Sequence, residues 1–257
     1  MSGRHARTRQ QMAITERELT AMTGELDMLH KETFPSVAKS LDEFTANLSH
    51  LRTSRHTARR SFLAGVGGAV VVGTIAACSS SSATGSGGTN YTGDLKVVAL
   101  AAALENLAVT AYAGALTMAG QGKLGKVPPS IAAFVKTAMG QHKDHSAAWN
   151  GVLKQAKLKP ITGAPLTITA GEVAKLHKAK SVADVAKLAL SLENAAASTY
   201  TFATENVSSA GGIMTAATIQ PVETMHAAIL SFVLGEYPVP TAFIGTGAAV
   251  HPAALTV

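Results

Sequence analysis

Apolar residues recur every third or fourth position in four long segments of the chain, which is the spacing of one buried helical face. We expect these helices at about 94–119, 130–155, 182–206 and 213–235. A shorter helix, capped by Thr169, is expected at about 170–177, between the second and third long segments. Pro221 is expected to kink the fourth long helix or to mark its effective start. Strand-prone stretches are brief, as in residues 161–169, so the pattern predicts an all-α fold.

In two of these helices the apolar face contains a glutamate that is followed by a tyrosine seven residues later. Glu105 stands in the tripeptide Leu-Glu-Asn and precedes Tyr112 by seven residues, and Glu193 stands in the same tripeptide and precedes Tyr200 by seven. This repetition indicates an internal duplication of a helix pair. The two tyrosines fall on the same face as the glutamates, where they can either hydrogen-bond to them or pack as ordinary core residues. The packing interpretation is favoured.

Each copy is followed by a helix with two polar residues at i, i+3 spacing, namely His142 with His145 and Glu223 with His226. Carboxylates and imidazoles inside apolar helices cost several kcal/mol unless something compensates them, and a bound metal is the usual compensation. Six residues are therefore predicted to converge as metal ligands: Glu105, His142, His145, Glu193, Glu223 and His226.

The links between the helices complete this picture. The first and second long helices, and the third and fourth, are joined by short links, whereas one long crossover joins the second to the third. With this topology and these residues, region 92–236 resembles ferritin-like proteins of the di-iron carboxylate class, and more narrowly exported, lipid-anchored ferritin-like domains. The resemblance implies a ferritin-like four-helix bundle with one long crossover between helices 2 and 3.

The ligand pattern of that family is Glu on helix 1, Glu-x-x-His on helix 2, Glu on helix 3 and Glu-x-x-His on helix 4. Five of the six positions match, and His142 stands where the family has a metal-bridging glutamate. The resemblance implies two iron ions and oxidation of Fe(II) by oxygen or peroxide. The expected roles are bridging for Glu223 and terminal ligation for the remaining matched residues, Glu105, His145, Glu193 and His226.

Replacing a bridging carboxylate with an imidazole at His142 changes the charge of the set. Three glutamates carry a formal charge of −3, which leaves two divalent ions incompletely neutralised, so the second ion is expected to bind more weakly. A neutral imidazole is expected to bind one metal through one nitrogen. Manganese, zinc, copper and nickel are alternatives to iron, because imidazole suits the last three.

Residues 58–77 have the features of an export signal. Arg59 and Arg60 form a pair that resembles the twin-arginine class, and Ile-Ala-Ala before Cys78 resembles a bacterial lipobox. The apolar run 62–77 is shorter than the ~20 residues of a membrane-spanning helix. By this resemblance, the twin-arginine machinery exports the chain, and Cys78 is lipidated and anchors it to the outer face of the cytoplasmic membrane. Residues 78–91 then form a flexible tether.

Charge and cysteine content agree with this organisation. Ten of the 22 Lys and Arg residues, including every arginine, lie in the first 60 residues. The later region has no basic stripe, which argues against nucleic-acid binding. Cys78 is the one cysteine of the chain, so no intrachain disulfide can form.

Residues 1–57 form an N-terminal extension, longer than the basic region of a signal. Two apolar stripes predict helices at about 15–30 and 36–51, with Leu19, Met22, Leu26 and Leu29 in the first and Val37, Leu41, Phe44 and Leu48 in the second. Either the start is assigned too early, or this is a cytoplasmic extension that is cut away with the signal. On both interpretations it does not contribute to the mature fold. The C-terminal tail, 237–257, is expected to pack across the bundle end or against a neighbour.

Three functions stay open at this point. The first is a membrane-tethered di-metal oxidase or peroxide-handling protein, and the second is a metal-binding or metal-buffering lipoprotein without catalysis. The third is a metal-free, degenerate ferritin-like bundle that serves as an envelope interaction or structural module. Iron storage in a closed shell is disfavoured, since a lipid tether on each chain does not suit a cage. A homodimer is an allowed assembly.

Overall fold

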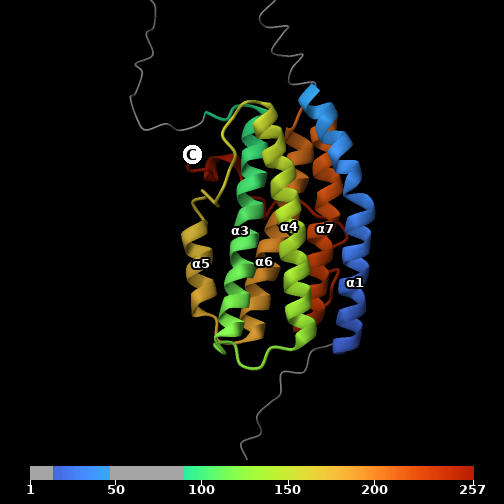
Figure 1. The fold of residues 1–257 in the computed structure, drawn as a ribbon, viewed down its shortest axis with the longest axis vertical. Coiled ribbons are helices and arrows are strands. Elements are labelled where there is room, and N and C mark those ends of the chain that lie inside the picture. The colour runs from blue at the N-terminus through green and yellow to red at the C-terminus, as the bar shows by residue number, and fades with distance from the viewer. Residues whose placement is uncertain (1–13, 47–89) are drawn as a thin grey trace, which may run out of the picture.

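The computed structural model of the chain describes residues 14–46 and 90–257. Arg59, Arg60, Cys78 and the rest of the expected signal lie outside the described residues. Four long helices form a bundle (Figure 1): α3 (Asp94–Gly120), α4 (Pro129–Gln155), α6 (Val182–Asn206) and α7 (Ala210–Leu234). Helix α3 pairs with α4, α6 pairs with α7, and a long crossover carries α5 (Thr169–Lys178). The predicted all-α bundle with one long crossover is confirmed.

Local signals in the sequence account for three of the helix ends in the bundle. Pro129 occupies the first turn of α4, where its missing N–H costs nothing. The Ser181 side chain accepts a hydrogen bond from the Asp184 N–H at the start of α6. Gly235 ends α7 in the left-handed conformation that glycine adopts without strain. These signals explain why the observed bounds lie close to those expected from periodicity.

The expected cap of the short helix is wrong, and one of the two alternatives for Pro221 is excluded. Helix α5 begins at Thr169 itself with Ile168 at the cap position, and the Thr169 hydroxyl instead donates to the Ala164 carbonyl at 2.6 Å. Helix α7 begins at Ala210 and continues through Pro221, so the proline does not mark its start. Tertiary packing keeps α7 helical on both sides of the proline although Pro221 cannot donate a backbone hydrogen bond.

Helix α3 is held inside the bundle by small side chains. Ala99, Ala102 and Ala103 are completely buried, and α3 contacts α6 as well as α4. By length and composition α3 could cross a membrane, and it is the one such helix among the described residues. The bundle nevertheless buries 67% of its most apolar window, which is typical of a core helix.

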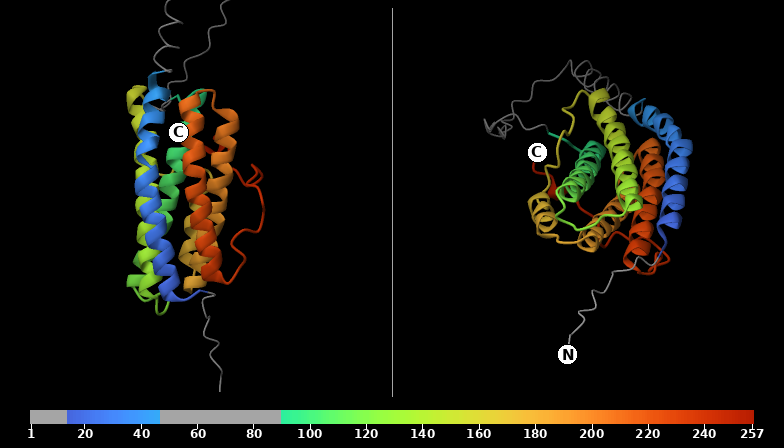
Figure 2. Two further views of the ribbon diagram at one scale, coloured as in Figure 1. Left: turned by 90° about the vertical axis from the view of Figure 1, so that its right-hand side faces the viewer. Right: turned by 60° about the horizontal axis from the view of Figure 1, so that its bottom comes forward.

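The N-terminal segment packs against the bundle in the full chain. Helix α1 (Glu16–Thr33) and the helical stretch 35–46 that follows it lie along α4 and α7 (Figures 1 and 2). Leu19 and Phe44 are completely buried there. Residues 1–57 are expected to be absent from the mature fold, which the full chain does not test. In the full chain the apolar stripes of the two helices cover an apolar face of the bundle.

The buried stripe of α1 also differs from the expected one. Leu29, placed in the stripe by sequence, is 40% exposed, whereas His30 is 4% exposed. The residues that face the bundle are Leu19, Thr23, Leu26 and His30. A buried histidine therefore occupies the last turn of α1, directly over α4.

Gly211 lies where the stretch 35–46 crosses the start of α7. A Cβ added there would lie 2.2 Å from the Ser40 carbonyl oxygen and 2.7 Å from the Phe44 backbone nitrogen. We expect Gly211→Ala to destabilise this packing by about 1 to 3 kcal/mol and to speed proteolysis near Phe44, because backbone atoms cannot yield as a side chain does. The control is Gly140→Ala, which adds its methyl group in open space. Equal protease resistance of the two variants would contradict the packing.

The end of the C-terminal tail returns to the crossover. Leu255 forms an isolated antiparallel bridge with Leu166, and the Val250 N–H donates to the Thr199 hydroxyl of α6 at 2.9 Å. Phe243, in the middle of the tail, is 90% exposed. The tail therefore ties α6 to the crossover at its end, while its centre leaves an aromatic side chain in solvent.

Candidate metal centre

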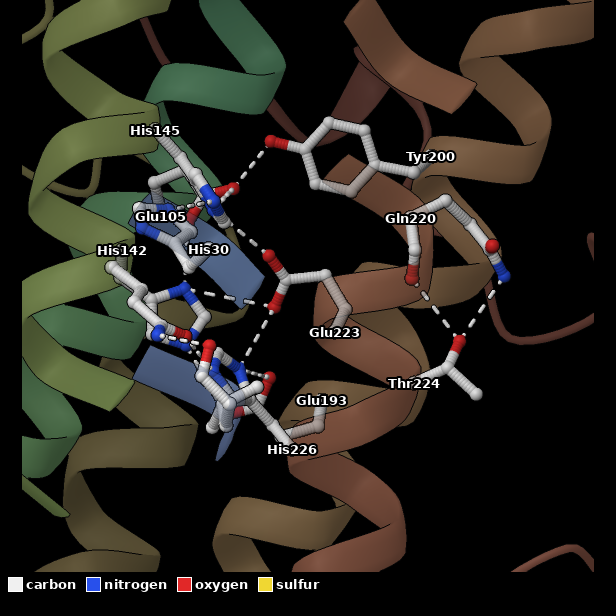
Figure 3. A network of polar contacts seen from close by, with 12 residues as sticks. His30, Glu105, His142, His145, Glu193, Tyr200, Gln220, Glu223, Thr224 and His226 are labelled. Atoms are coloured by element: carbon white, nitrogen blue, oxygen red, sulfur yellow. Dashed lines mark hydrogen bonds and ion pairs between the residues drawn. The ribbon is translucent and has the colours of Figure 1, made fainter. Parts of the chain in front are cut away.

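The four bundle helices each direct polar side chains to one interior region, about midway along the bundle (Figure 3). Helix α3 contributes one residue, α4 two, α6 one and α7 two. All of them are buried, and they are the six residues singled out from the sequence: Glu105, His142, His145, Glu193, Glu223 and His226. Periodicity alone thus placed every predicted ligand on the correct helix face.

One ligand group forms around Glu105. Its members are Glu105, His142, His145 and Glu223, and each offers one ligand atom within 4.8 Å of the others. His142 Nδ1 lies 2.6 Å from Glu105 Oε2, and His145 Nδ1 lies 3.0 Å from Glu223 Oε1. The four side chains are therefore close enough to one another to surround one ion.

A second ligand group forms around Glu193. It consists of His142, Glu193, Glu223 and His226, with ligand atoms again within 4.8 Å of one another. His142 Nε2 lies 3.2 Å from Glu193 Oε1, and His226 Nδ1 lies 3.3 Å from Glu193 Oε2. The two groups share His142 and Glu223, so they form one centre with two adjacent halves.

The two shared residues face both halves in different ways. Glu223 directs Oε1 toward His145 and Oε2 toward His226, 3.5 Å from its Nδ1, as a carboxylate between two cations would. His142 directs Nδ1 to Glu105 and Nε2 to Glu193. The His142 imidazole therefore lies between the two ligand groups, with one ring nitrogen toward each.

Three polar atoms in the centre have no hydrogen-bond partner among the described residues. They are both carboxylate oxygens of Glu223 and Nδ1 of His145. The Glu223 oxygens lie 3.0 Å from His145 Nδ1 and 3.5 Å from His226 Nδ1, as ion pairs without hydrogen-bond geometry, and a buried carboxylate without a hydrogen-bond donor is costly. Oxygen and imidazole nitrogen donors in this number suit a first-row divalent cation, so the residues present fit a metal.

The two tyrosines of the duplication hold the glutamates in a crossed arrangement. Tyr112 on α3 donates to Glu193 on α6, and Tyr200 on α6 donates to Glu105 on α3. Trp149 Nε1 in turn donates to the Tyr200 hydroxyl at 2.9 Å. The favoured interpretation of the tyrosines as packing residues was wrong, because each one orients a candidate ligand of the other copy.

The outer nitrogens of the two terminal histidines have partners that the sequence analysis missed. His226 Nε2 lies 2.8 Å from the side-chain oxygen of Gln141, and His145 Nε2 lies 3.2 Å from Nε2 of His30. His30 could have been found from its position, because it continues the spacing of Leu19 and Leu26 along α1. Helical spacing also places Gln141 on the face of Ala138 and His145, at i+3 and i−4, but it does not show that the amide would reach His226 on another helix.

Attraction between the glutamates and the histidines sets the charge of the metal-free centre. Burial alone raises the pKa of Glu105 and of Glu193, but neighbouring imidazoles outweigh burial and hold both carboxyl pKa values below the ordinary range. Burial alone lowers the pKa of His145, yet Glu105 and Glu223 raise it to about 9. Without metal, protons on the imidazoles therefore balance the carboxylates.

Metal binding should strengthen as pH rises from about 6 to about 9. The pKa of His145 in the metal-free protein is about 9, above its ordinary 6.5, so at neutral pH an incoming cation must displace a proton. For each proton that the metal displaces, the metal affinity falls by up to about tenfold for every pH unit below that pKa. Competition titrations with zinc at several pH values, with released protons counted in weak buffer, check this. A pH-independent affinity without proton release would contradict it.

A small pocket reaches the first ligand group between α3 and α6. Its cavity volume is about 10 Å³, about the room that one water molecule needs, and it touches both Glu105 and His142. The remaining lining residues are apolar: Leu104, Leu107, Ala108, Leu192 and Ala196. Apart from Glu105 and His142, such a lining offers few hydrogen-bond partners to water.

Comparison with known proteins covers the bundle. The family model described as a ferritin-like domain matches residues 93–236, which span α3 to α7 and all six candidate ligands. Searches of curated proteins and of solved structures returned no match. Helix α1 and His30 lie outside the matched region.

Proposed function

Because the chain belongs to the ferritin-like domain family, we propose that it binds a pair of metal ions at the centre formed by α3, α4, α6 and α7. The observation that carries the proposal is Glu223, whose two buried oxygens have no hydrogen-bond donor among the described residues and face the two ligand groups. Each half has two carboxylates and two imidazoles within reach, but a neutral His142 has one unprotonated nitrogen and can bind the ion of one half only.

Iron is the proposed metal, with manganese, zinc or copper as alternatives. Carboxylate and imidazole ligands in a ferritin-like bundle suit iron. His142 is neutral when it binds a metal, so the centre supplies −3 against two divalent ions and the second ion should bind more weakly. The distance from a histidine nitrogen to a Glu223 oxygen is 3.0 Å in the half with His145 and 3.5 Å in the half with His226. We therefore expect the half with His145 to bind its ion more tightly.

Oxidation of Fe(II) by oxygen or peroxide is the proposed activity. Bound iron supplies the redox change. The chain's own residues hold the metal in place: Tyr112 and Tyr200 orient the terminal glutamates, and Gln141 orients His226.

Lipid anchoring to the outer face of the cytoplasmic membrane, through Cys78 after twin-arginine export, completes the proposal. Its support is the sequence alone: the paired Arg59 and Arg60, and Ile-Ala-Ala before the cysteine. A cut before Cys78 would separate α1 from the bundle. The precursor and the anchored form would then differ in the helix that covers α4 and α7.

Oxygen consumption by the purified full chain tests the activity. Anaerobic protein loaded with Fe(II) and then exposed to oxygen should consume oxygen and oxidise the iron faster than Fe(II) in buffer does. Tightly bound metal without oxygen consumption would instead indicate a metal-binding or buffering protein. The matched reference is Glu223→Gln, which removes the shared carboxylate while keeping its shape.

A further inference from the structure

Helix α1 reaches the metal centre through His30. The His30 ring is 4% exposed, stacks on Phe34 with centroids 4.7 Å apart, and directs Nε2 to Nε2 of His145 at 3.2 Å (Figure 3). Phe34 also contacts the His145 ring, with centroids 5.6 Å apart. The last turn of α1 therefore encloses the outer side of one candidate ligand.

Two ring nitrogens at this distance can form a hydrogen bond only if one carries a proton and the other does not. The other nitrogen of His145, Nδ1, lies 3.0 Å from Glu223 Oε1 on the inner side, where a metal would sit. A neutral imidazole that binds a metal through Nδ1 carries its proton on Nε2. In the metal-bound form His145 must then donate, and His30 must accept.

The second half of the centre also depends on α1. Gln141 accepts from His226 Nε2 at 2.8 Å, and its amide nitrogen donates to the Leu26 carbonyl of α1 at 3.4 Å. The amide orientation that presents its oxygen to His226 is thus the one that presents its nitrogen to α1. Both terminal histidines have outer partners that α1 provides or orients.

We propose that α1 is a structural part of the metal centre, with His30 as a positioning residue that accepts the Nε2 proton of His145 and thereby directs its Nδ1 to the metal. This rests on the proposed metal binding and goes beyond it, because α1 lies outside the region matched by the family. An outer partner of a metal-bound histidine is typically worth about 10- to 100-fold in metal affinity. A chain that retains α1 should therefore bind metal more tightly than one that has lost it.

The test compares two substitutions in the full chain. His30→Phe keeps an aromatic ring against Phe34 but cannot accept a hydrogen bond, whereas the carbonyl of His30→Gln can. Zinc affinity is measured by competition with a chromophoric chelator, and NMR of the zinc-loaded protein follows the His145 Nε2 proton. We expect a loss of about tenfold or more in His30→Phe, together with loss of that proton signal. His30→Gln should retain both to within a few-fold.

Each outcome is decisive. Equal zinc affinity of the parent chain and His30→Phe would overturn the role of His30 and leave the proposed function intact. Equal losses in both variants would also overturn it, because an acceptor at position 30 would then be irrelevant. A parent chain that binds no zinc, iron or manganese would overturn this inference together with the proposed function.

Discussion

Substituting glutamine for Glu223 is expected to release both metal ions, since this carboxylate alone among the glutamates belongs to both ligand groups. The amide keeps the shape of the side chain but removes its negative charge and one of its two acceptor oxygens. Loss of an outer partner costs about 10- to 100-fold in affinity, so loss of a shared ligand should cost at least about 100-fold. Metal content after exhaustive dialysis, measured by elemental analysis, checks the result.

The control for this variant is Glu236→Gln, which makes the same chemical change at an exposed position just beyond α7. It should retain the metal content of the parent chain. Retention of two ions by Glu223→Gln would show that Glu223 is not a shared ligand, and the bridging role would have to be abandoned.

Thermal stability should depend strongly on metal. Any ion that binds the folded chain alone stabilises it by RT ln(1 + [L]/Kd), which is about 2.7 kcal/mol when the free ion is at 100 times Kd. For a domain of this size each kcal/mol raises Tm by roughly 2 to 4 °C. Loading the metal-free protein should therefore raise Tm by roughly 5 to 10 °C, and a chelator should reverse the change. Differential scanning calorimetry of both forms measures it.

The Glu223→Gln variant distinguishes a rise in Tm caused by metal at this centre from one caused by nonspecific metal binding. Its Tm should hardly respond to metal or chelator, because its centre no longer holds the ion. A parent chain whose Tm is insensitive to chelator would indicate that the imidazoles and carboxylates serve only as a packed polar core, as the metal-free interpretation holds.

The bundle and its six candidate ligands follow from sequence periodicity because the relevant information is local. The faces that carry Glu105, Glu193 and the two i, i+3 pairs are fixed by helical geometry alone, and apolar neighbours require those faces to point inward. Internal duplication adds the pairing of helices. Hence convergence could be expected before any coordinates were known.

The partners of those ligands depend on which helix lies opposite, and periodicity does not contain that information. Tyr112 and Tyr200 were expected to pack as core residues, yet each donates a hydrogen bond to the glutamate of the other copy. His142 was expected to use one nitrogen, but its ring lies between two groups and presents both. Ring orientation is set by tertiary packing and not by position in the helix.

The role of α1 was missed for a different reason. Its apolar stripe indicates a helix with something to cover, but not what it covers, and the signal-like residues 58–77 favoured a segment apart from the fold. In the full chain Leu19 and Leu26 have an apolar face of α4 and α7 to bury against, and this packing brings His30 to His145. Two positions of the expected stripe were wrong, since Thr23 is buried in place of Met22 and His30 in place of Leu29, while Leu19 and Leu26 are buried as expected.

Elemental analysis of the full chain after reconstitution with Fe(II) tests the central claim most directly, beside a variant that carries both Glu105→Ala and Glu193→Ala. Convergence of the four helices on a two-part centre predicts about two ions per parent chain and fewer than one per variant chain. A parent chain that holds no more metal than the variant would contradict it.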